Sequence, residues 1–302
     1  MPRLFLSGVA RLVAIMLMAS FLGAVLLRVA PGFSSSEQEL TAGLSSQSIQ
    51  AIRQEHAGDA NIPRFYIHYL GSLLRGDLGR SQSLNQPVTE LLRDRLPVTL
   101  RSLGFALLVG WLLGLAFAIG ATTLATRLFS PMSEGLSAVF ISFPAAALAL
   151  VFVLLRLPPL AAAALLVFPK VYRYSRNLLD RSYELPHVLT AHAKGAGRWR
   201  ILFWHVVPSA WPQLLALLGV SVSIAIGVLL PIEVICDVPG IGQLAWQAAQ
   251  SRDLPLLVNL TVIVTFFTVC ATTFSDSANR GLQTQQANAP RAADPGLLRS
   301  TA

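Results

Sequence analysis

The chain has 302 residues, of which 54% are hydrophobic and only 13% are charged. A soluble domain usually carries about 25% charged residues, so this composition excludes an ordinary soluble protein and indicates one that crosses a membrane several times. The formal net charge is +8, but the basic residues lie between apolar runs and form no single polar face, which is typical of membrane orientation and argues against a nucleic-acid partner.

The first predicted element is a membrane span over residues 12–27, within a first segment of residues 1–30. This uncharged run is slightly shorter than the roughly 20 residues of a typical span, but Arg11 and Arg28 lie at its ends and their long side chains can reach the lipid headgroups. A cleaved signal peptide is the alternative, and Arg28 and the lack of a clear small-residue cleavage site argue against it. The basic tail predicts a cytoplasmic N-terminus.

A polar segment over residues 31–97 comes next. Its acidic and basic residues nearly cancel, and long loops are translocated with little regard to charge, so we expect it on the external side. Residues 48–56 predict a short helix, and residues 62–74 predict an amphipathic helix that lies on the membrane or packs on the bundle. The sequence GDLGRS at residues 76–81 indicates a glycine turn.

Five more spans are predicted between residues 98 and 276. They cover residues 102–126, 135–155, a stretch that begins at 157, 206–232 and 254–275. In the second span we expect the glycines to be small-residue positions for close helix packing; these are Gly104, Gly110, Gly114 and Gly120. Pro144 predicts a kink in the third span, which either lines a pathway or is passive.

The fourth span is the least apolar of the six. It is strongly apolar only to residue 168, and Lys170, Arg173 and Arg176 follow. We therefore expect a long helix whose cytoplasmic end projects out of the bilayer. After the sixth span, residues 277–302 form a polar cytoplasmic tail that we expect to be disordered beyond Arg280.

A polar, basic stretch over residues 183–207, here called the knob, separates the fourth and fifth spans. A short helix over residues 188–194 is predicted to end at Gly195 and Gly197, because glycine enters the left-handed conformation at little cost. A second helix begins near Trp199. Two interpretations are open: the knob is where another protein holds this one, or it is an ordinary cytosolic loop whose arginines satisfy the positive-inside rule.

A second polar stretch over residues 233–253, here called the scoop, follows the fifth span. Its proline and glycines predict a sharp reversal, and residues 243–251 predict a short helix that dips back. Glu233 is costly at the end of a span unless it is partnered or hydrated. It either faces a substrate amine or a partner subunit, or it anchors the scoop by hydrogen bonds to the backbone. We expect Arg252 and Asp253 to cap a helix or pair locally.

Several kinds of chemistry are absent from the sequence. There is no G-x-x-x-x-G-K-[ST] phosphate loop, so any ATP has to be bound by another chain. The five histidines form no recognised metal pair, and neither a G-x-S-x-G elbow nor a zincin motif is present. The sequence therefore predicts no enzyme activity, no cofactor and no metal. Cys236 and Cys270 are expected to be free thiols, since they are predicted to lie too far apart to pair.

Four motifs carry a resemblance to a known family. The run TAHAKG at residues 190–195, followed by His205 and Pro208, resembles the EAA loop of ABC importer permeases, in particular the dipeptide/oligopeptide/nickel branch. The GDLG-x-S turn, the sequence RLPVTL at residues 95–100 and the scoop resemble the same branch in the same order. The departures are Leu189 in place of the acidic residue, Cys236 in place of a phenylalanine, the sequence APGF at residues 30–33, a short turn at residues 156–159, and the tail.

The resemblance implies an all-α, polytopic membrane protein with six transmembrane helices, both termini in the cytoplasm, and a location in the cell inner membrane. It implies that the knob is a coupling loop which sits in a groove of an ATPase subunit, through Thr190, Ala191, Ala193, Lys194, Gly195, Arg198, His205 and Pro208. It implies that the scoop is a re-entrant gate at the external mouth of the pathway, formed by Glu233, Pro239, Gly240, Gly242, Arg252 and Asp253.

The partners that the resemblance implies are a second similar permease, two ATP-binding subunits, a periplasmic substrate-binding protein and membrane lipid. The expected function is ATP-driven import of a peptide-like or nickel-type solute by alternating access. The alternatives are a transporter or channel that is not coupled to ATP, and a divergent accessory membrane subunit. The first would be expected to carry polar residues in mid-span or an internal repeat, and we find neither in the sequence.

Overall fold

The computed structural model describes residues 75–124 and 129–288, together with residues 13–15, 17–19, 21–23, 25, 69 and 71–73. These residues fold into helices joined by turns, with one isolated bridge between Arg80 and Pro87, which confirms the all-helical prediction for this part of the chain. The main elements are α5 (Val88–Leu124), α6 (Phe129–Ser142), α7 (Ala145–Leu154), α8 (Pro159–Tyr183), α9 (Pro186–Ala193), α10 (Arg198–Ile201), the π-helix η2 (Leu202–Val206), α11 (Val207–Ile235), α12 (Ile241–Gln250) and α13 (Leu254–Asn288).

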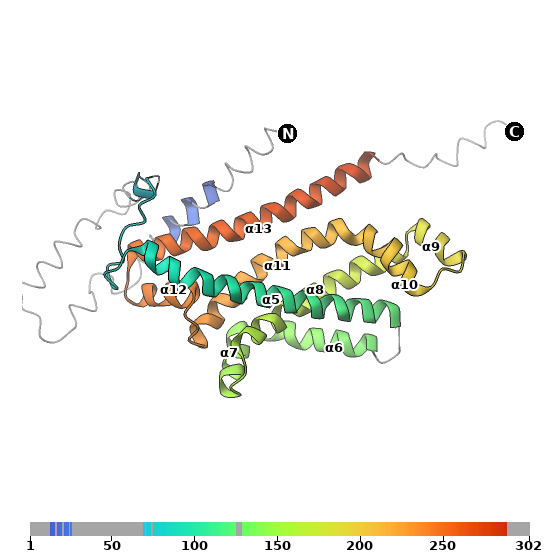
Figure 1. The fold of residues 1–302 in the computed structure, drawn as a ribbon, viewed down its shortest axis with the longest axis horizontal. Helices are drawn as coiled ribbons and strands as arrows, with labels where there is room; N and C mark the ends of the chain where they lie inside the picture. The colour runs from blue at the N-terminus through green and yellow to red at the C-terminus, as the bar shows by residue number, and fades with distance from the viewer. Residues whose placement is uncertain are drawn as a thin grey trace, which may run out of the picture.

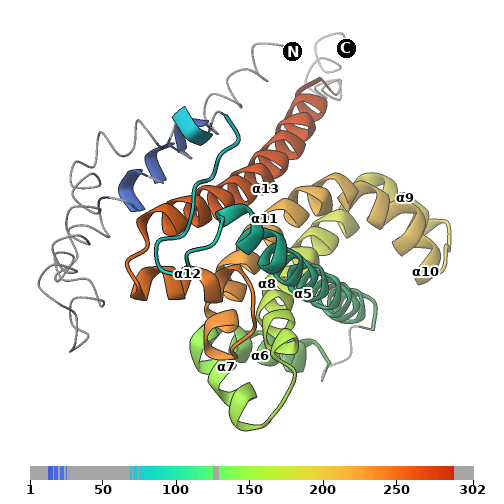
Figure 2. The same cartoon turned by 60° about the vertical axis from the view of Figure 1, so that its left-hand side comes forward.

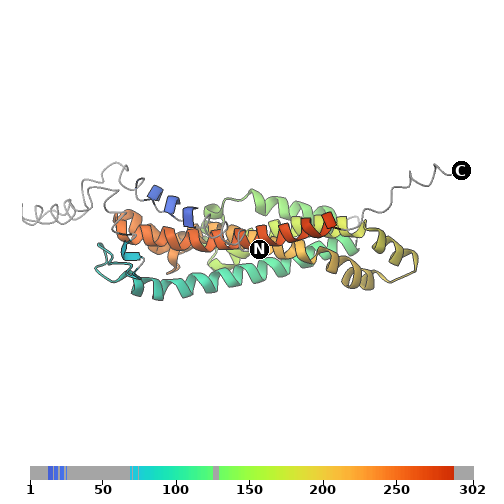
Figure 3. The same ribbon diagram turned by 90° about the horizontal axis from the view of Figure 1, so that it is seen from above.

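The long helices run along one axis of an elongated bundle (Figure 1). Helices α9 and α10 project at one end of this axis, and α12 lies at the opposite end beside the beginning of α5. The view from above shows the same separation of the two ends (Figure 3). The knob and the scoop therefore lie at opposite ends of the molecule.

Among the residues that the structure describes, three helices are long and apolar enough to cross a membrane: Val88–Thr123, Arg198–Ile235 and Leu254–Ser277. They correspond to the predicted second, fifth and sixth spans. Helices α6 and α7 pass the same test as a pair, and α8 does not pass it because Lys170, Arg173 and Arg176 lower its hydropathy. The pieces of the predicted first span that the structure describes are helical. The count of six spans stays a prediction.

The third predicted span is broken at Pro144, where α6 and α7 meet at an angle of 97°. Proline has no N–H to donate and crowds the carbonyl one turn earlier, and it pushes the residue before it out of the helical region. Pro144 has extended dihedrals, with φ −61° and ψ 140°. The expected kink is therefore a full break, which is larger than the sequence indicated.

Helices α5 and α8 make the most extensive contact between two helices of the described residues, and glycines on α5 let the two backbones approach. A Cβ atom added at Gly110 would lie 2.8 Å from Val167 Cγ1, and one added at Gly114 would lie 2.6 Å from Val171 Cγ1. At Gly104 the same atom would meet nothing within 4 Å. Among the described residues no helix packs closely at Gly104, so the packing role of this glycine stays a prediction.

The last helix continues further than the sequence suggested. Helix α13 runs to Asn288, so the first part of the predicted disordered tail is helical. Adding a residue to an existing helix costs far less than starting a helix, and Ala, Arg, Leu and Gln are good helix formers. The remainder of the tail, the predicted helix at residues 48–56 and the turn at residues 30–33 lie outside the described residues. Of the predicted helix at 62–74, residues 69 and 71–73 are described and are helical.

Both cysteines are free thiols, as expected. Cys236 lies just past the end of α11, where burial raises the pKa of its thiol above the ordinary range. A neutral thiol is consistent with the apolar contacts that Cys236 makes with the cluster around Leu229 and Ile232.

Candidate functional site

The knob is a helix–turn–helix whose turn is closed by Gly195. Gly195 has a φ of +76° and donates its N–H to the His192 carbonyl at 3.0 Å, while Ala196 donates to the Ala191 carbonyl at 3.2 Å. This pair of bonds is a Schellman motif, which ends a helix and satisfies its last carbonyls. Helix α9 begins at Pro186, two residues before the predicted start, and α10 begins at Arg198, one residue before the predicted start.

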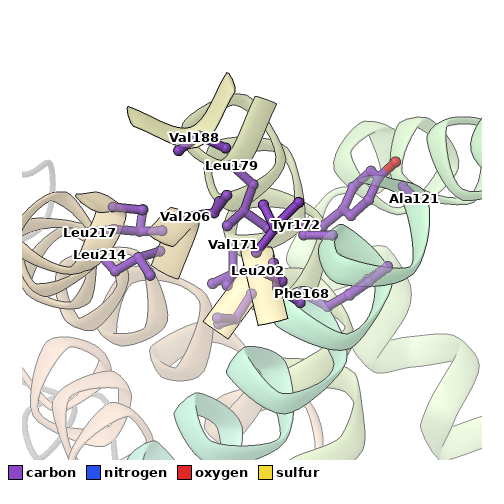
Figure 4. Packing of buried hydrophobic residues seen from close by; sticks show 14 of the residues in the cluster. Ala121, Phe168, Val171, Tyr172, Leu179, Val188, Leu202, Val206, Leu214 and Leu217 are labelled. Carbon is purple, nitrogen blue, oxygen red and sulfur yellow. The ribbon is translucent and has the colours of Figure 1, made fainter. Parts of the chain in front are cut away.

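The knob sits on an apolar core that extends into the bundle. Val188 of α9 is 2% exposed and packs in one cluster with Leu179 of α8, Ile201 of α10, and Leu202 and Val206 of η2. Figure 4 shows Val188, Leu179 and Val206 side by side, with Leu214 and Leu217 of α11 next to them. Because elements on both sides of the turn contribute to one core, the knob is fixed to the long helices α8 and α11.

Two polar contacts add to this attachment. His187 Nε2 lies 3.2 Å from Ser209 Oγ, which joins α9 to the beginning of α11. Arg198 Nη1 donates to the Thr123 carbonyl at 3.4 Å, which joins α10 to the end of α5. Three long helices of the bundle therefore hold the knob, so a force applied to it is passed on to all three.

The predicted coupling residues fall into two groups. Ala191 is buried and belongs to the apolar core, and His205 is half-buried within η2. The others lie on the exposed surface of the knob and of the helix that follows it: Thr190, Ala193, Lys194, Gly195, Arg198 and Pro208. The structure therefore brings most of the predicted set to one exposed end of the bundle, with Ala191 facing inward.

The helix that leaves the knob accommodates Pro208 through a wider turn. Proline in a helix removes a hydrogen bond and crowds the carbonyl four residues earlier, here that of Trp204. The π-helix η2 ends at Val206, two residues before Pro208, and such local widening is frequent at functional sites. The chain from Arg198 to Ile235 therefore continues as one helix.

At the opposite end, the scoop turns back over the end of α11. Glu233 is 0% exposed, and its Oε2 accepts the N–H of Gly242 at 2.7 Å. A Cβ atom added at Gly240 would overlap the Glu233 carboxylate, and one added at Gly242 would lie 2.6 Å from the Leu230 carbonyl. A side chain at position 242 would meet backbone, and one at position 240 would displace the Glu233 carboxylate, so the backbone of the scoop closes directly on Glu233. This geometry corresponds to an anchor of the scoop.

Helix α5 supports the scoop from the side. Ile241 donates its N–H to Thr99 Oγ1 at 2.8 Å, which satisfies a free donor at the beginning of α12. Arg95 Nη1 donates to Gln243 Oε1 at 2.9 Å, and Gln243 Nε2 in turn donates to Asp237 Oδ1. The first turns of α12 are therefore bonded to the N-terminal part of α5.

Asp253 joins the scoop to the glycine turn of residues 76–81. Its side chain is 1% exposed. Oδ2 accepts bonds from Ser81 Oγ and from both the N–H and the Oγ of Ser83, while Oδ1 accepts the N–H of Leu256 at 3.1 Å. Asp253 therefore caps α13 and also holds residues 81–83 in place. Figure 2 shows the teal segment that contains them beside α12 and the start of α13.

Asn259 of α13 forms a second set of hydrogen bonds with the segment that precedes α5. Asn259 Nδ2 donates to the Leu78 carbonyl at 2.9 Å, and Asn259 Oδ1 accepts from Tyr69 OH at 3.0 Å. Pro239 and Arg252 of the predicted gate lie at the edges of the scoop, where Pro239 is exposed and Arg252 has a φ of +57°.

A cavity of about 390 Å³ lies between α11, α12 and α13 behind the scoop. Its lining is largely apolar and includes Leu230, Trp246, Leu257 and Thr261, with no charged residue. The Glu233 carboxylate does not line it. The acid of the scoop is thus directed at the scoop backbone and away from this space.

Some residues of these contacts were not found by sequence reasoning. Thr99 is inside the RLPVTL motif but has no predicted role, Ser81 is predicted only as part of a turn, and Ser83 lies beyond that turn. Asn259 is inside an apolar run. An uncompensated polar residue in a span, such as Asn259, was the available signal, because it has to find a partner. Its partners, however, lie about 180 residues away in sequence.

Comparison with known proteins gives a family match. The family model described as "Binding-protein-dependent transport system inner membrane component" matches residues 98–285. A protein of Sinorhizobium fredii named as a probable peptide ABC transporter permease is 26% identical over 83% of this chain and 88% of its own length. A Brucella abortus protein named for a peptide transport system permease is 28% identical, covering 91% and 96%. The nickel import system permease protein NikB of Staphylococcus aureus (strain bovine RF122 / ET3-1) is 25% identical, covering 88% and 86%.

Proposed function

Since the chain belongs to the family of binding-protein-dependent transport system inner membrane components, we propose that its two ends divide the work of an ATP-driven importer. As a member of this family, the chain is a membrane permease subunit of an ABC importer. In our proposal the knob receives the ATP-binding subunit in the cytoplasm, and the scoop frames the external mouth of the pathway.

The observation that carries the proposal is the construction of the knob. A helix closed by the Schellman motif at Gly195 presents Thr190, Lys194 and Arg198 on an exposed surface, while its inner face belongs to the core of the long helices. An ordinary loop does not need a shared core with α8 and α11. A rigid body that is exposed on one face and fixed to the spans on the other is suited to pass on a push.

The mechanism that follows is alternating access. A partner changes a two-state equilibrium only through contacts that differ between the states. Closure of the ATPase dimer would move the knob, and α8 and α11 would carry this displacement towards the scoop. Solute would then enter beneath the scoop and leave towards the cytoplasm after hydrolysis.

The finer assignments belong to the same proposal. The chain pairs with a second similar permease, two ATP-binding subunits and a periplasmic substrate-binding protein, and its six spans place both termini in the cytoplasm. The domain plan is an external segment over residues 31–97 and a permease core over residues 98–276. The names of the relatives, which refer to peptides and nickel, support a peptide-like or nickel-type solute.

The alternative of a transporter that is not coupled to ATP finds little support in the helices that qualify as spans. Secondary transporters place ionisable residues near the middle of the membrane. In α11, Glu233 lies two residues before the end of the helix, at the scoop, and its carboxylate accepts a hydrogen bond from the scoop backbone.

The test is a pull-down of the tagged protein, co-expressed with the ATPase gene beside its own and solubilised in detergent. We expect the ATPase to co-purify with the wild type and to be lost from Gly195→Asp, because that residue has a left-handed backbone on the exposed surface. Gln250→Asp is the control, since it adds the same charge at an exposed position on the opposite end. Absence of the ATPase from the wild-type preparation would overturn the proposal.

A further inference from the structure

A dense polar cluster joins α6 to α8 near the end of the bundle that carries the knob. Arg176 of α8 donates through Nη1 to Glu134 Oε1 at 2.5 Å and to Tyr172 OH at 2.9 Å. Its Nη2 donates to Ser130 Oγ at 2.8 Å. Tyr172 OH also lies 2.8 Å from Ser133 Oγ. Ser130, Ser133 and Glu134 all belong to α6. Arg176 and Tyr172 therefore form hydrogen bonds with three side chains of this helix.

Arg176 has the geometry that such a cluster needs. The guanidinium is planar and presents several donors in a fixed fork, and here the two terminal nitrogens contact three different side chains. The arginine side chain is 22% exposed, whereas that of Glu134 is 59% exposed. The ion pair alone is therefore partly screened by solvent, and the cluster depends on the bonds to Tyr172 and Ser130 as well.

Asp180 lies on the same helix and completes the surroundings of Arg176. Its Oδ2 is 3.6 Å from Arg176 Nε. Burial raises the pKa of the Asp180 carboxyl above its usual range, while the charge of Arg176 acts in the opposite direction. Asp180 adds negative charge beside the guanidinium from one turn further along α8, towards the knob.

The position of the cluster connects it to the knob. Tyr172 is 1% exposed and belongs to the same apolar cluster as Val188 of α9 and Ile201 of α10. In Figure 4, the ring of Tyr172 extends from this cluster towards α5 and α6. Helix α8 runs on to Tyr183, and α9 begins three residues later. A displacement of the knob therefore reaches Arg176 through one continuous helix.

We propose that Arg176 is a positioning residue for transport, which makes the broken span α6–α7 follow the knob when the ATPase moves it. The inference rests on the proposed function. The cluster joins α6 to α8 by directed hydrogen bonds between defined side chains. With it, the two helices keep their register, so the α6–α7 break moves together with α8.

The test measures distances between spin labels in the assembled complex with its ATPase. Cys236→Ser and Cys270→Ser remove the native thiols, and cysteines introduced at Glu184 and Met132 carry one label pair, which reports α6 relative to the knob. A second pair at Glu184 and Leu84 reports the knob relative to the external end. All three labelled positions are exposed. Each pair is measured without nucleotide and after trapping with ATP and vanadate.

In the wild type we expect the second distance to change on trapping and the first to remain the same. In Arg176→Gln we expect the second distance to change as before, while the first distribution shifts or broadens because α6 no longer follows. Arg176→Lys should give an intermediate result, since one ammonium cannot bond Tyr172, Glu134 and Ser130 together. Arg173→Gln is the matched control, because Arg173 is exposed on the same helix.

Two results would overturn the inference. The first is an Arg176→Gln complex whose two distances match the wild type in both states. The second is a wild-type complex in which trapping moves neither distance, which would overturn the proposed function as well. If Arg176→Gln fails to assemble, the double variant Ser130→Ala/Glu134→Ala removes both bonds from Arg176 to α6, and the same criteria apply.

Discussion

Glu233 Oε2 accepts the backbone N–H of Gly242 at 2.7 Å, nine residues further along the chain. The carboxylate is fully buried, and the scoop closes over it because Gly240 has no side chain. The acid at the end of a membrane helix therefore serves the adjoining backbone, and the scoop depends on it for its shape.

Removing this acceptor should destabilise the scoop. In Glu233→Ala the Gly242 N–H loses its partner in a buried site, and an unpaired buried donor costs about 1–3 kcal/mol. In Glu233→Gln the amide oxygen can still accept, so the loss should be smaller. The measurement is thermal unfolding in detergent, followed by tryptophan fluorescence. Asp94→Asn, at an exposed position on α5, is the control, and equal midpoints for all variants would contradict the anchor role.

Gly240 and Glu233 should be strongly coupled. Gly240→Ala places a Cβ on the Glu233 carboxylate, although its backbone, with φ −108° and ψ −170°, is one that alanine adopts freely. The destabilisation should therefore be large in the wild type and smaller in Glu233→Ala, where the carboxylate is gone. A double-mutant cycle on unfolding midpoints measures the coupling. Additive effects would show that the two sites are independent.

The knob offers a comparison of two neighbouring glycines. Gly195 has a φ of +76°, and Gly197 has a φ of −65° and a ψ of 150°, while an added Cβ meets nothing within 4 Å at either one. Any difference between the two alanine variants thus comes from the backbone alone. Gly195→Ala should cost roughly 1–2 kcal/mol, and Gly197→Ala should be close to neutral.

Two measurements can detect this difference in stability between the two variants. Hydrogen exchange of the amides of α9 should be faster in Gly195→Ala than in Gly197→Ala, because the helix end opens more easily. Gly195→Ala should also retain less ATPase in the pull-down than Gly197→Ala. Equal exchange in the two variants would mean that the Schellman turn does not stabilise the knob.

Loss of Asp253 should release the segment around Arg80. Asp253→Ala removes the acceptor of three bonds from Ser81 and Ser83, and each 1.4 kcal/mol of lost local stability raises the open population about tenfold. Trypsin added to intact spheroplasts should therefore cleave after Arg80, an exposed residue, much faster in the variant. Asp94→Ala serves as the charge-matched control. Cleavage only in inverted vesicles would place this segment in the cytoplasm.

Many structural elements of this molecule can be predicted from short stretches of its sequence. The apolar runs predicted the positions of α5, α11 and α13, because the hydropathy of a span depends on composition over about 20 residues. Gly195 was predicted to end α9 because its conformational freedom is a property of the residue itself. Pro144 was predicted to kink its helix because its missing N–H and its ring are likewise properties of the residue itself.

Tertiary structure decided what these elements contact. Asp253 bonds residues about 170 positions away, and Arg176 bonds α6 about 40 positions away, and no local pattern specifies such pairs. The tertiary structure alone also set the 97° angle at Pro144 and the burial of Glu233 against glycine backbone. The physical reason is that helix formation depends on neighbouring residues in the chain, whereas the partner of a buried polar group is chosen by the packing of distant helices.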